Sequence, residues 1–327
     1  IEELKGVNAQ LISKNSGLAK QLDETRNELM REISELKSKN SLNAKKISDT
    51  DIQRSWKHIG FLVRQFVDTY VAKVISPEYL QLLDEQGNLG GISSICAAPN
   101  AVLQCGATAP LVFQSMLWNF LILNVFDFEA EHWAGDLGKK FTHIFGRLSK
   151  HVIDTSGENK HSLMEALQEW RFRSVDLFCR LEVSINKDRR MSELATAMMR
   201  EIAAFIPPST EQQAQTMNQD AFDLIAAVAQ LDMELRLSKA YYNVIFFNTT
   251  PPYFPCHFGY PFDATHMEQT SIGPRIPQHQ DAVHPNLDLA ISPGLIKAGN
   301  ADGTHYHLDR VLVKMVVCCN INYFIGD

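Results

Sequence analysis

Apolar residues in the first 47 positions recur at steps of three and four, as they do along one side of a helix. The leucines of this stripe are Leu4, Leu11, Leu18, Leu22, Leu29 and Leu36. A stripe this narrow, with Lys, Glu, Asn and Ser on the other faces, is typical of a coiled-coil seam. Asn8 and Asn15 fall in the seam, where buried Asn favours two strands and fixes the register. The pattern predicts a parallel coiled coil over 1–47, and one amphipathic helix folded back on its own domain is the alternative.

The second zone, 48–247, has helical spacing in several places. Ser48 to Asp51 is an N-cap signal. Helices are predicted over 52–74, 110–133, 139–152, 162–185, 191–205 and 211–247. The segment 110–133 is nearly all apolar, but polar residues such as Gln114 and Asn119 interrupt it. It is therefore predicted as the buried centre of an all-α bundle rather than as a membrane span.

The third zone, 248–327, is rich in Pro and His, and its prolines exclude a regular helix. Short apolar runs at 287–291 and 311–317 flank a turn signal at 299–303, which predicts a small antiparallel β hairpin. The predicted fold class is mainly α: an N-terminal coiled-coil helix, an all-α helical bundle, and a C-terminal irregular segment with a small antiparallel β element.

Composition limits the class of protein. The chain has 327 residues, 45% of them hydrophobic and 21% charged, which is ordinary for a globular protein with a real core. The formal net charge of -7 makes overall nucleic-acid binding a poor hypothesis. The six cysteines are irregularly spaced and include no CxxC pair, which indicates reduced, buried thiols. The N-terminus is charged rather than apolar, so a cytoplasmic protein without a signal peptide is expected.

An acidic cluster at the end of the most apolar segment suggests an alternative enzymatic function. Its candidate residues are Asp127, Glu129, Glu131 and His132. Carboxylates one helical turn apart could bind a divalent metal, as in a terpenoid synthase. A Glu-x-x-His spacing, also found at Glu158 and His161, could serve a di-metal site in a bundle. A polar helix end is the simpler interpretation, because neither site has its remaining ligands elsewhere in the sequence.

Histidines concentrate in the third zone, and His305 and His307 would lie on the same side of an extended segment. They could bind Zn or Cu if Asp302, Asp309 or Cys256 supplied a third ligand. The simpler interpretation is a solvated turn. No Walker loop, Gly-x-Gly-x-x-Gly or Gly-x-Ser-x-Gly sequence occurs, and no cofactor is predicted.

Two stretches carry a resemblance. One is Asp49 to Val67, and the other runs from Ile291 through the Gly299–Gly303 turn to Lys314. With the preceding coiled coil, they resemble a group of uncharacterised filamentous-fungal coiled-coil and helical proteins. The resemblance implies an intracellular fungal protein and assigns no activity. The predicted function is therefore an assembly or scaffold-type interaction protein that forms homo-oligomers, with no membrane span and no enzymatic role, and a helical-bundle enzyme is the alternative.

Overall fold

The chain is described from a computed structural model. It describes residues 14–22, 24–25, 28, 47–87, 89–96, 98–126, 131–155, 159–181, 187–207, 210–246, 258–270 and 286–319. The chain divides into two compact units, 1–45 and 46–327, and each is considered by itself. Of the described residues, 66% are helical and 13% are in strands, so this part of the chain is mainly helical. In the first unit, residues 14–22 are helical.

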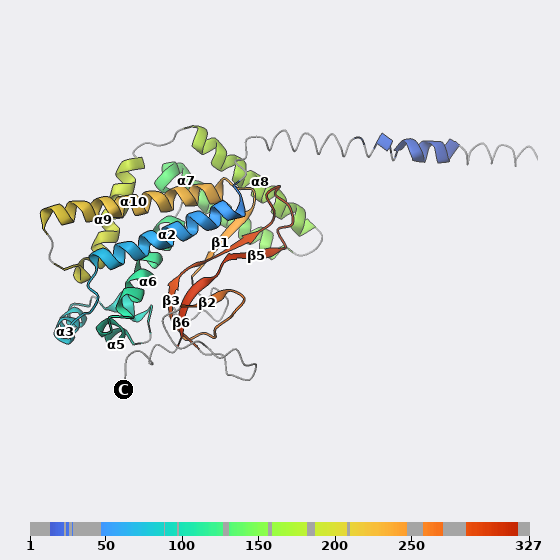
Figure 1. Cartoon of the computed structure of the whole chain (residues 1–327). Helices are drawn as coiled ribbons and strands as arrows, with labels where there is room; N and C mark the ends of the chain where they lie inside the picture. Colours follow the sequence, from blue (N-terminus) through green and yellow to red (C-terminus); the bar gives the residue numbers. More distant parts are fainter. Residues whose placement is uncertain are drawn as a thin grey trace, which may run out of the picture. The chain divides into compact units, whose positions relative to one another are not determined.

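The second unit, called the body below, contains helices along most of its length (Figure 1). They are α2 (Asp49–Tyr70), α3 (Pro77–Glu85), α4 (Gly90–Ser93), α5 (Pro99–Gln104), α6 (Ala109–Leu121), α7 (Glu131–Asp154), α8 (Asn159–Arg180), α9 (Lys187–Ile202) and α10 (Glu211–Arg236). A π-helix, η2 (Ile122–Phe126), follows α6, and a 3-10 turn, η3 (Ala203–Phe205), follows α9. The short helices α3, α4 and α5 lie in a region for which the sequence pattern predicted no element.

Local sequence explains where helices α2 and α10 begin. The Ser48 side chain accepts a hydrogen bond from the Asp51 amide, which confirms the predicted N-cap of α2. Thr210 and Gln213 form a capping box at the start of α10, each side chain bonding the other residue's backbone. These caps satisfy amides that the first helical turn leaves without partners.

The core of the body surrounds α6. Its residues are almost all buried, because α2 packs on one side and strand β3 (Leu287–Ser292) on another. The rings of Trp56 on α2 and Trp118 on α6 stack with centroids 5.5 Å apart. The window Ala109–Phe126 is long and apolar enough to span a membrane, but 78% of it is buried inside the body. That burial is typical of the core helix predicted here.

The predicted single helix over 110–133 is wrong in its second half. The α-helix ends at Leu121 and continues as the π-helix η2 to Phe126. There the Asn124 side chain donates to the Phe120 carbonyl at 2.8 Å, and Arg236 donates to the Phe126 carbonyl at 2.8 Å. These side chains supply hydrogen bonds to backbone carbonyls around the end of the regular helix.

The predicted helix over 211–247 is also wrong at its end. Helix α10 stops at Arg236, and β1 (Tyr241–Ile245) follows. The β1 sequence, Tyr-Tyr-Asn-Val-Ile, is rich in residues that favour strands. Strand β1 pairs with β4 (Gly294–Ala298), so the helical zone and the C-terminal zone share one sheet.

The strands form two three-stranded sheets (Figure 1). The first has the order β1-β4-β5 and is antiparallel, with β5 spanning Asp309–Val313. The second has the order β2-β6-β3, with β2 at Met267–Gln269 and β6 at Met315–Cys319. Strand β6 is parallel to β2 and antiparallel to β3. The predicted strand over 287–291 is confirmed, whereas the predicted strand over 311–317 is two strands, one in each sheet.

Close backbone contact explains why the predicted hairpin divides between two sheets. At Gly294 a Cβ atom would lie 2.9 Å from the Met315 nitrogen, so only glycine allows β4 to pass this close to the β5–β6 junction. The Trp56 indole donates to the neighbouring Pro293 carbonyl at 3.3 Å and ties this corner to α2. The Gly299–Gly303 turn joins β4 to β5, not β3 to β6 as predicted.

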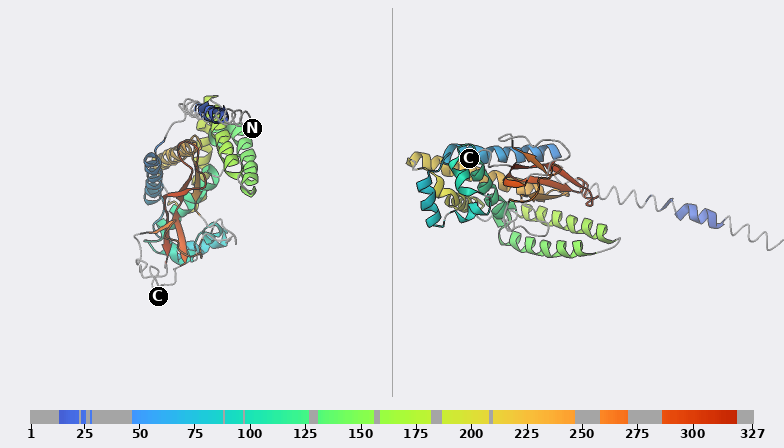
Figure 2. Two further views of the ribbon diagram at one scale, coloured as in Figure 1. Left: turned by 90° about the vertical axis from the view of Figure 1, so that its right-hand side faces the viewer. Right: turned by 90° about the horizontal axis from the view of Figure 1, so that it is seen from below.

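Helices α7 and α8 form an antiparallel hairpin along one side of the body (Figure 2). A small cluster around Phe141 holds them together, with the Trp170 and Phe178 rings 5.1 and 5.6 Å from the Phe141 ring. This cluster is separate from the α6 core.

Candidate functional site

A pocket of about 270 Å³ lies between the α7–α8 hairpin, the end of α10 and strand β1. Its lining residues are Phe126, Thr142, Phe145, Gly146, Ser149, Arg171, Asp232, Leu235, Arg236, Tyr241, Tyr242, Asn243 and Val244. Strand β1 is an edge strand of its sheet. The walls of the pocket are therefore formed by an edge strand, by the end of α10 and by the side of α7 that carries Thr142 and Ser149.

Arg171 determines the geometry of one wall of the pocket. Its guanidinium donates to the carbonyls of Arg236, Ser238 and Ala240 at 2.7, 2.7 and 2.9 Å. It also donates to the Gln168 side chain at 2.7 Å. A cation that binds the last carbonyls of a helix stabilises that helix end, and here it also fixes the turn into β1.

Arg171 is 5% exposed, and burial lowers the pKa of its guanidinium to about 10. That value still leaves the side chain charged at neutral pH. Because its donors are used by backbone carbonyls, we assign Arg171 a structural role rather than a direct role in chemistry.

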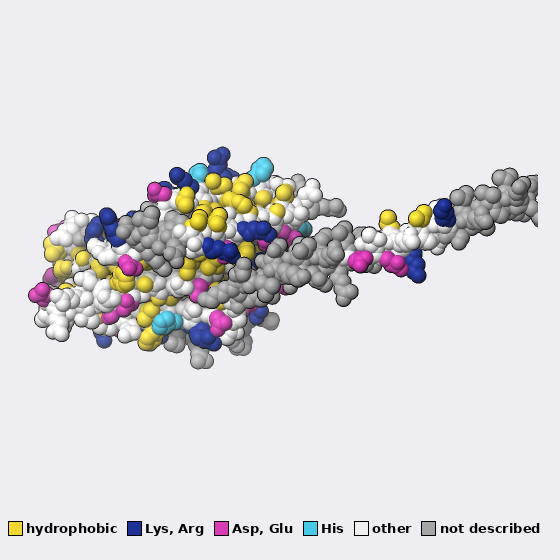
Figure 3. All heavy atoms as spheres, turned by 90° about the horizontal axis from the view of Figure 1, so that it is seen from above, with side chains coloured by type: hydrophobic (Ala, Val, Ile, Leu, Met, Phe, Trp, Pro, Cys, Tyr) yellow, Lys and Arg dark blue, Asp and Glu magenta, His cyan; other side chains and the backbone are white. Residues whose placement is uncertain are grey.

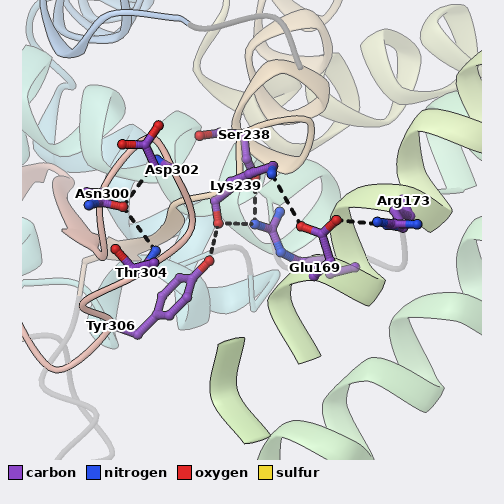
Figure 4. A network of polar contacts seen from close by, with 9 residues as sticks. Glu169, Arg173, Ser238, Lys239, Asn300, Asp302, Thr304 and Tyr306 are labelled. Atoms are coloured by element: carbon purple, nitrogen blue, oxygen red, sulfur yellow. Dashed lines mark hydrogen bonds and ion pairs between the residues drawn. The ribbon is translucent and has the colours of Figure 1, made fainter. Parts of the chain in front are cut away.

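A polar network continues from this turn to the surface (Figure 4). The Tyr306 hydroxyl donates to the Lys239 carbonyl at 2.7 Å, and burial raises the pKa of Tyr306 to about 12. The Glu169 carboxylate forms ion pairs with Arg173 Nε at 2.8 Å and with Lys239 Nζ at 3.5 Å. Partial burial alone would raise the pKa of Glu169, but these two cations lower it overall. The turn between β4 and β5 is thereby fastened to the end of α10.

The one carboxylate among the described lining residues is that of Asp232, and it already forms an ion pair with Arg236. Arg236 Nε lies 2.9 and 3.0 Å from the two carboxylate oxygens of Asp232, which is 3% exposed. The second guanidinium nitrogen of Arg236 bonds the Phe126 carbonyl. A carboxylate engaged on both oxygens is poorly placed to act as a general base. The geometry favours binding over acid–base catalysis.

Two hydroxyls of α7 line the pocket without using their hydrogen-bonding capacity. Thr142 Oγ1 and Ser149 Oγ are buried and have no hydrogen-bond partner among the residues that the structure describes. They lie seven residues apart, two turns on the same side of α7. Unsatisfied buried hydroxyls are uncommon, and each can both donate and accept. A small polar molecule in the pocket would satisfy them.

The acidic cluster predicted as an enzymatic site lies outside the described residues. Asp127 and Glu129 are not described, and of Glu131 and His132 only the helical backbone is described. Glu158 is likewise outside the described residues, and His161 is in the first turn of α8. The enzymatic alternative stays a hypothesis.

His305 and His307 lie in a turn, not in the extended segment that was assumed for them. His305 has a φ of 61°, and its ring nitrogen lies 2.8 Å from the Thr304 hydroxyl. The His305 and His307 rings are 6.0 Å apart, and His161 of α8 lies 5.2 Å from His307. Within the described ranges, no group of three or more His, Cys, Asp and Glu side chains could hold a metal ion.

The prediction of buried thiols is confirmed at three of the five described cysteines and is wrong at the other two. Cys96, Cys318 and Cys319 are free and buried, and burial raises the pKa of each. Cys105 and Cys179 form no disulfide within the described residues and are partly exposed, while Cys256 lies outside those residues. Buried thiols with raised pKa values are poor nucleophiles.

The predicted oligomerisation stripe is described at two of its leucines. Leu18 and Leu22 are 56% and 72% exposed, one helical turn apart. In this unit hydrophobic side chains lie on one side of the helix and acidic ones on the other (Figure 3). Leu4, Leu11, Leu29 and Leu36 lie outside the described residues.

Comparisons of the chain with protein-family models, with curated proteins and with solved structures gave no match.

Proposed function

We propose that the protein is an intracellular assembly or interaction protein that self-associates through an N-terminal coiled coil. The leucines predicted to form the seam are Leu4, Leu11, Leu18, Leu22, Leu29 and Leu36. The body would then present its binding surfaces in two or more copies. The fungal resemblance of the α2 and C-terminal segments agrees with an intracellular protein.

One observation supports this proposal above the others. Every described residue of the N-terminal segment is exposed, including both leucines of its stripe. An isolated helix has marginal stability in water, and most helices in proteins are stabilised by packing of their apolar side. A narrow leucine stripe packs best against a second copy of itself.

The test is the solution molar mass of the full chain by light scattering. The variant Leu18→Lys/Leu22→Lys is expected to be monomeric where the native chain is a dimer or larger. The matched control Lys14→Ala/Lys20→Ala changes exposed residues of the same helix outside the stripe and is expected to keep the native mass.

A chain that starts at Ser48 should behave like the leucine variant. A monomeric native chain would contradict the proposal, because no partner would then cover the stripe. If the truncated chain keeps the full-length oligomer number, the interface lies in the body and the stripe serves another partner.

The pocket supports a second candidate function, the binding of a small polar molecule. The supporting observation is the pair of unsatisfied hydroxyls of Thr142 and Ser149 inside it. A ligand should raise the thermal midpoint of the native chain in a panel of amino acids, sugars and small carboxylic acids.

The variant Thr142→Val/Ser149→Ala should abolish that rise without unfolding the chain. The control Ser192→Ala/Thr216→Val changes hydroxyls that are exposed on α9 and α10, and it should leave the rise intact. A rise that survives the pocket variant would place the ligand elsewhere.

A further inference from the structure

The α7–α8 hairpin exposes two rows of apolar side chains on one face. The row on α7 contains Leu137, Ile144 and Leu148, and the row on α8 contains Leu163, Trp170, Leu177 and Leu181. These side chains are between 37% and 59% exposed. The spacing of seven and four residues keeps each row on one side of its helix.

The two rows adjoin each other and lie away from the pocket. Trp170 of the α8 row contacts Phe141, which lies between Leu137 and Ile144 along α7. The pocket-lining residues Thr142 and Ser149 lie on another side of α7. We call the two rows together the outer face of the hairpin. A contiguous exposed apolar surface of this kind indicates an interaction site.

Cations follow the apolar row of α7. Lys140 and Arg147 come three residues after Leu137 and Ile144, so they lie beside that row. Lys150, His143 and His151 are exposed on the same helix. Between positions 137 and 153 the sequence has no Asp or Glu. Figure 3 shows hydrophobic side chains at the upper edge of the body next to Lys, Arg and His side chains.

The charge on α7 is not neutralised within the described part of the body. There Lys140, Arg147 and Lys150 form no ion pairs, whereas Arg173 and Arg180 on α8 pair with Glu169 and Asp176. The chain as a whole is acidic, so this basic edge is a local feature. Because charges are screened beyond about 8 Å at physiological salt, the local charge governs docking.

The basic edge decides which occupant fits the outer face. A second copy that met this face with its own would bring an identical basic edge. Residues 1–45 carry eight Lys and Arg against seven Asp and Glu, so they offer no net negative charge. Apolar rows with Trp and Leu beside Lys and Arg are the arrangement by which helices lie in the surface of an anionic bilayer.

We propose that the outer face of the α7–α8 hairpin docks on a membrane surface rich in anionic phospholipid. The apolar rows enter the headgroup region, and Lys140, Arg147 and Lys150 face lipid phosphates. The hairpin lies in the plane of the surface and does not span the bilayer. This proposal does not depend on self-association, although two or more linked copies would bind more tightly.

The experiment is co-sedimentation of the full chain with vesicles of phosphatidylcholine alone or with 30% phosphatidylserine. Binding is expected only with phosphatidylserine, and it should weaken as salt is raised. The variant Lys140→Gln/Arg147→Gln/Lys150→Gln should lower the binding constant roughly 100-fold. The control Lys57→Gln/Arg64→Gln/Lys73→Gln removes the same charge from exposed sites elsewhere and should bind like the native chain.

The contribution of the apolar rows is tested separately from that of the charges. The variant Ile144→Ser/Leu148→Ser should also lose binding, and Trp170 emission should shift to the blue on vesicle addition, a shift absent from Trp170→Phe. Repeating the assay with Leu18→Lys/Leu22→Lys separates this proposal from the coiled coil, because the monomer should still discriminate between the two vesicles.

Several results would overturn the proposal. One is equal binding to both vesicles, another is no binding to either, and a third is an equal loss of binding in the Lys57→Gln/Arg64→Gln/Lys73→Gln control. A change of oligomer number in the hairpin variants without lipid would identify the face as a contact between chains. Binding of an acidic amphipathic peptide at the outer face, with no lipid binding, would identify a protein partner instead.

Discussion

Helix α6 and the α7–α8 hairpin both carry long apolar patterns, but they use them differently. In α6 even Gln114 and Ser115 are buried, because α2, α5, α9 and β3 all pack against this helix. In the hairpin the cluster around Phe141 is small, and the outer face is exposed. The body thus separates a region that supplies stability from a region whose apolar surface remains available for a partner.

The largest effect should come from the α6 core. Trp118→Ala removes a ring that is 1% exposed and stacked on Trp56. We expect the free energy of unfolding to fall by about 4 kcal/mol in denaturant titrations. The hairpin variant Trp170→Ala should cost less, about 2 kcal/mol, because 37% of this side chain is already in water. Equal losses would contradict the distinction between the two regions.

The second largest loss of stability is expected where Arg171 of α8 binds the turn after α10. Arg171→Met leaves the carbonyls of Arg236, Ser238 and Ala240 without their donor, and we expect a loss of about 3 kcal/mol. Arg173→Met, two residues along α8, removes only an exposed ion pair and should cost at most about 1 kcal/mol. If the two variants unfold at the same denaturant concentration, Arg171 does not stabilise the junction.

The cohesion of the hairpin itself depends on Phe141. Phe141→Ala should cost about 2 kcal/mol, less than a comparable change in the larger core. The loss should be local, since the cluster is separate from the α6 core. Amide hydrogen exchange should accelerate in α7 and α8 and stay unchanged in α6. Uniform acceleration throughout the body would mean that the hairpin and the core unfold together.

Alkaline pH should lower the free energy of unfolding through the two buried thiols of strand β6. Burial raises the pKa of Cys318 and Cys319 to about 12 from an ordinary value of about 9. From pH 9 upward the unfolded chain loses these protons while the native chain keeps them, so the free energy of unfolding falls with rising pH. We expect roughly 1 kcal/mol per thiol at pH 10. The variant Cys318→Ala/Cys319→Ala should show a flatter dependence between pH 8 and 10.

The smallest effect should come from the outer face. Ile144→Ser and Leu177→Ser should each change the free energy of unfolding by less than about 1 kcal/mol, because both side chains are already about half exposed. The same variants should lower retention on a hydrophobic column. A loss of 2 kcal/mol or more would show that the rows are part of the fold and not a surface held open for a partner.

Local signals in the sequence predicted the features that depend on near neighbours. The Ser48 cap of α2, the helical spacing of α8 and α9, the buried segment at α6 and the strand at 287–291 were all found in this way. Each depends on residues within a few positions of one another. The pocket had no such signal, because Thr142, Arg171, Asp232 and Tyr241 come from four different elements.

The sequence by itself therefore determined a mainly helical chain with a leucine stripe at its start and strand-forming runs near its end. Tertiary structure decided how the end of α10 is held, because Arg171 donates to the Arg236 carbonyl from 65 positions away along the chain. It also decided that β5 and β6 lie in different sheets, at a point where β4 passes too close to the Met315 nitrogen for a side chain at Gly294. Finally, it decided that Leu163 and Leu177 of α8 are exposed while Val175 is buried. Periodicity shows that a helix has an apolar side, but only the packing of the other elements determines how much of that side is covered.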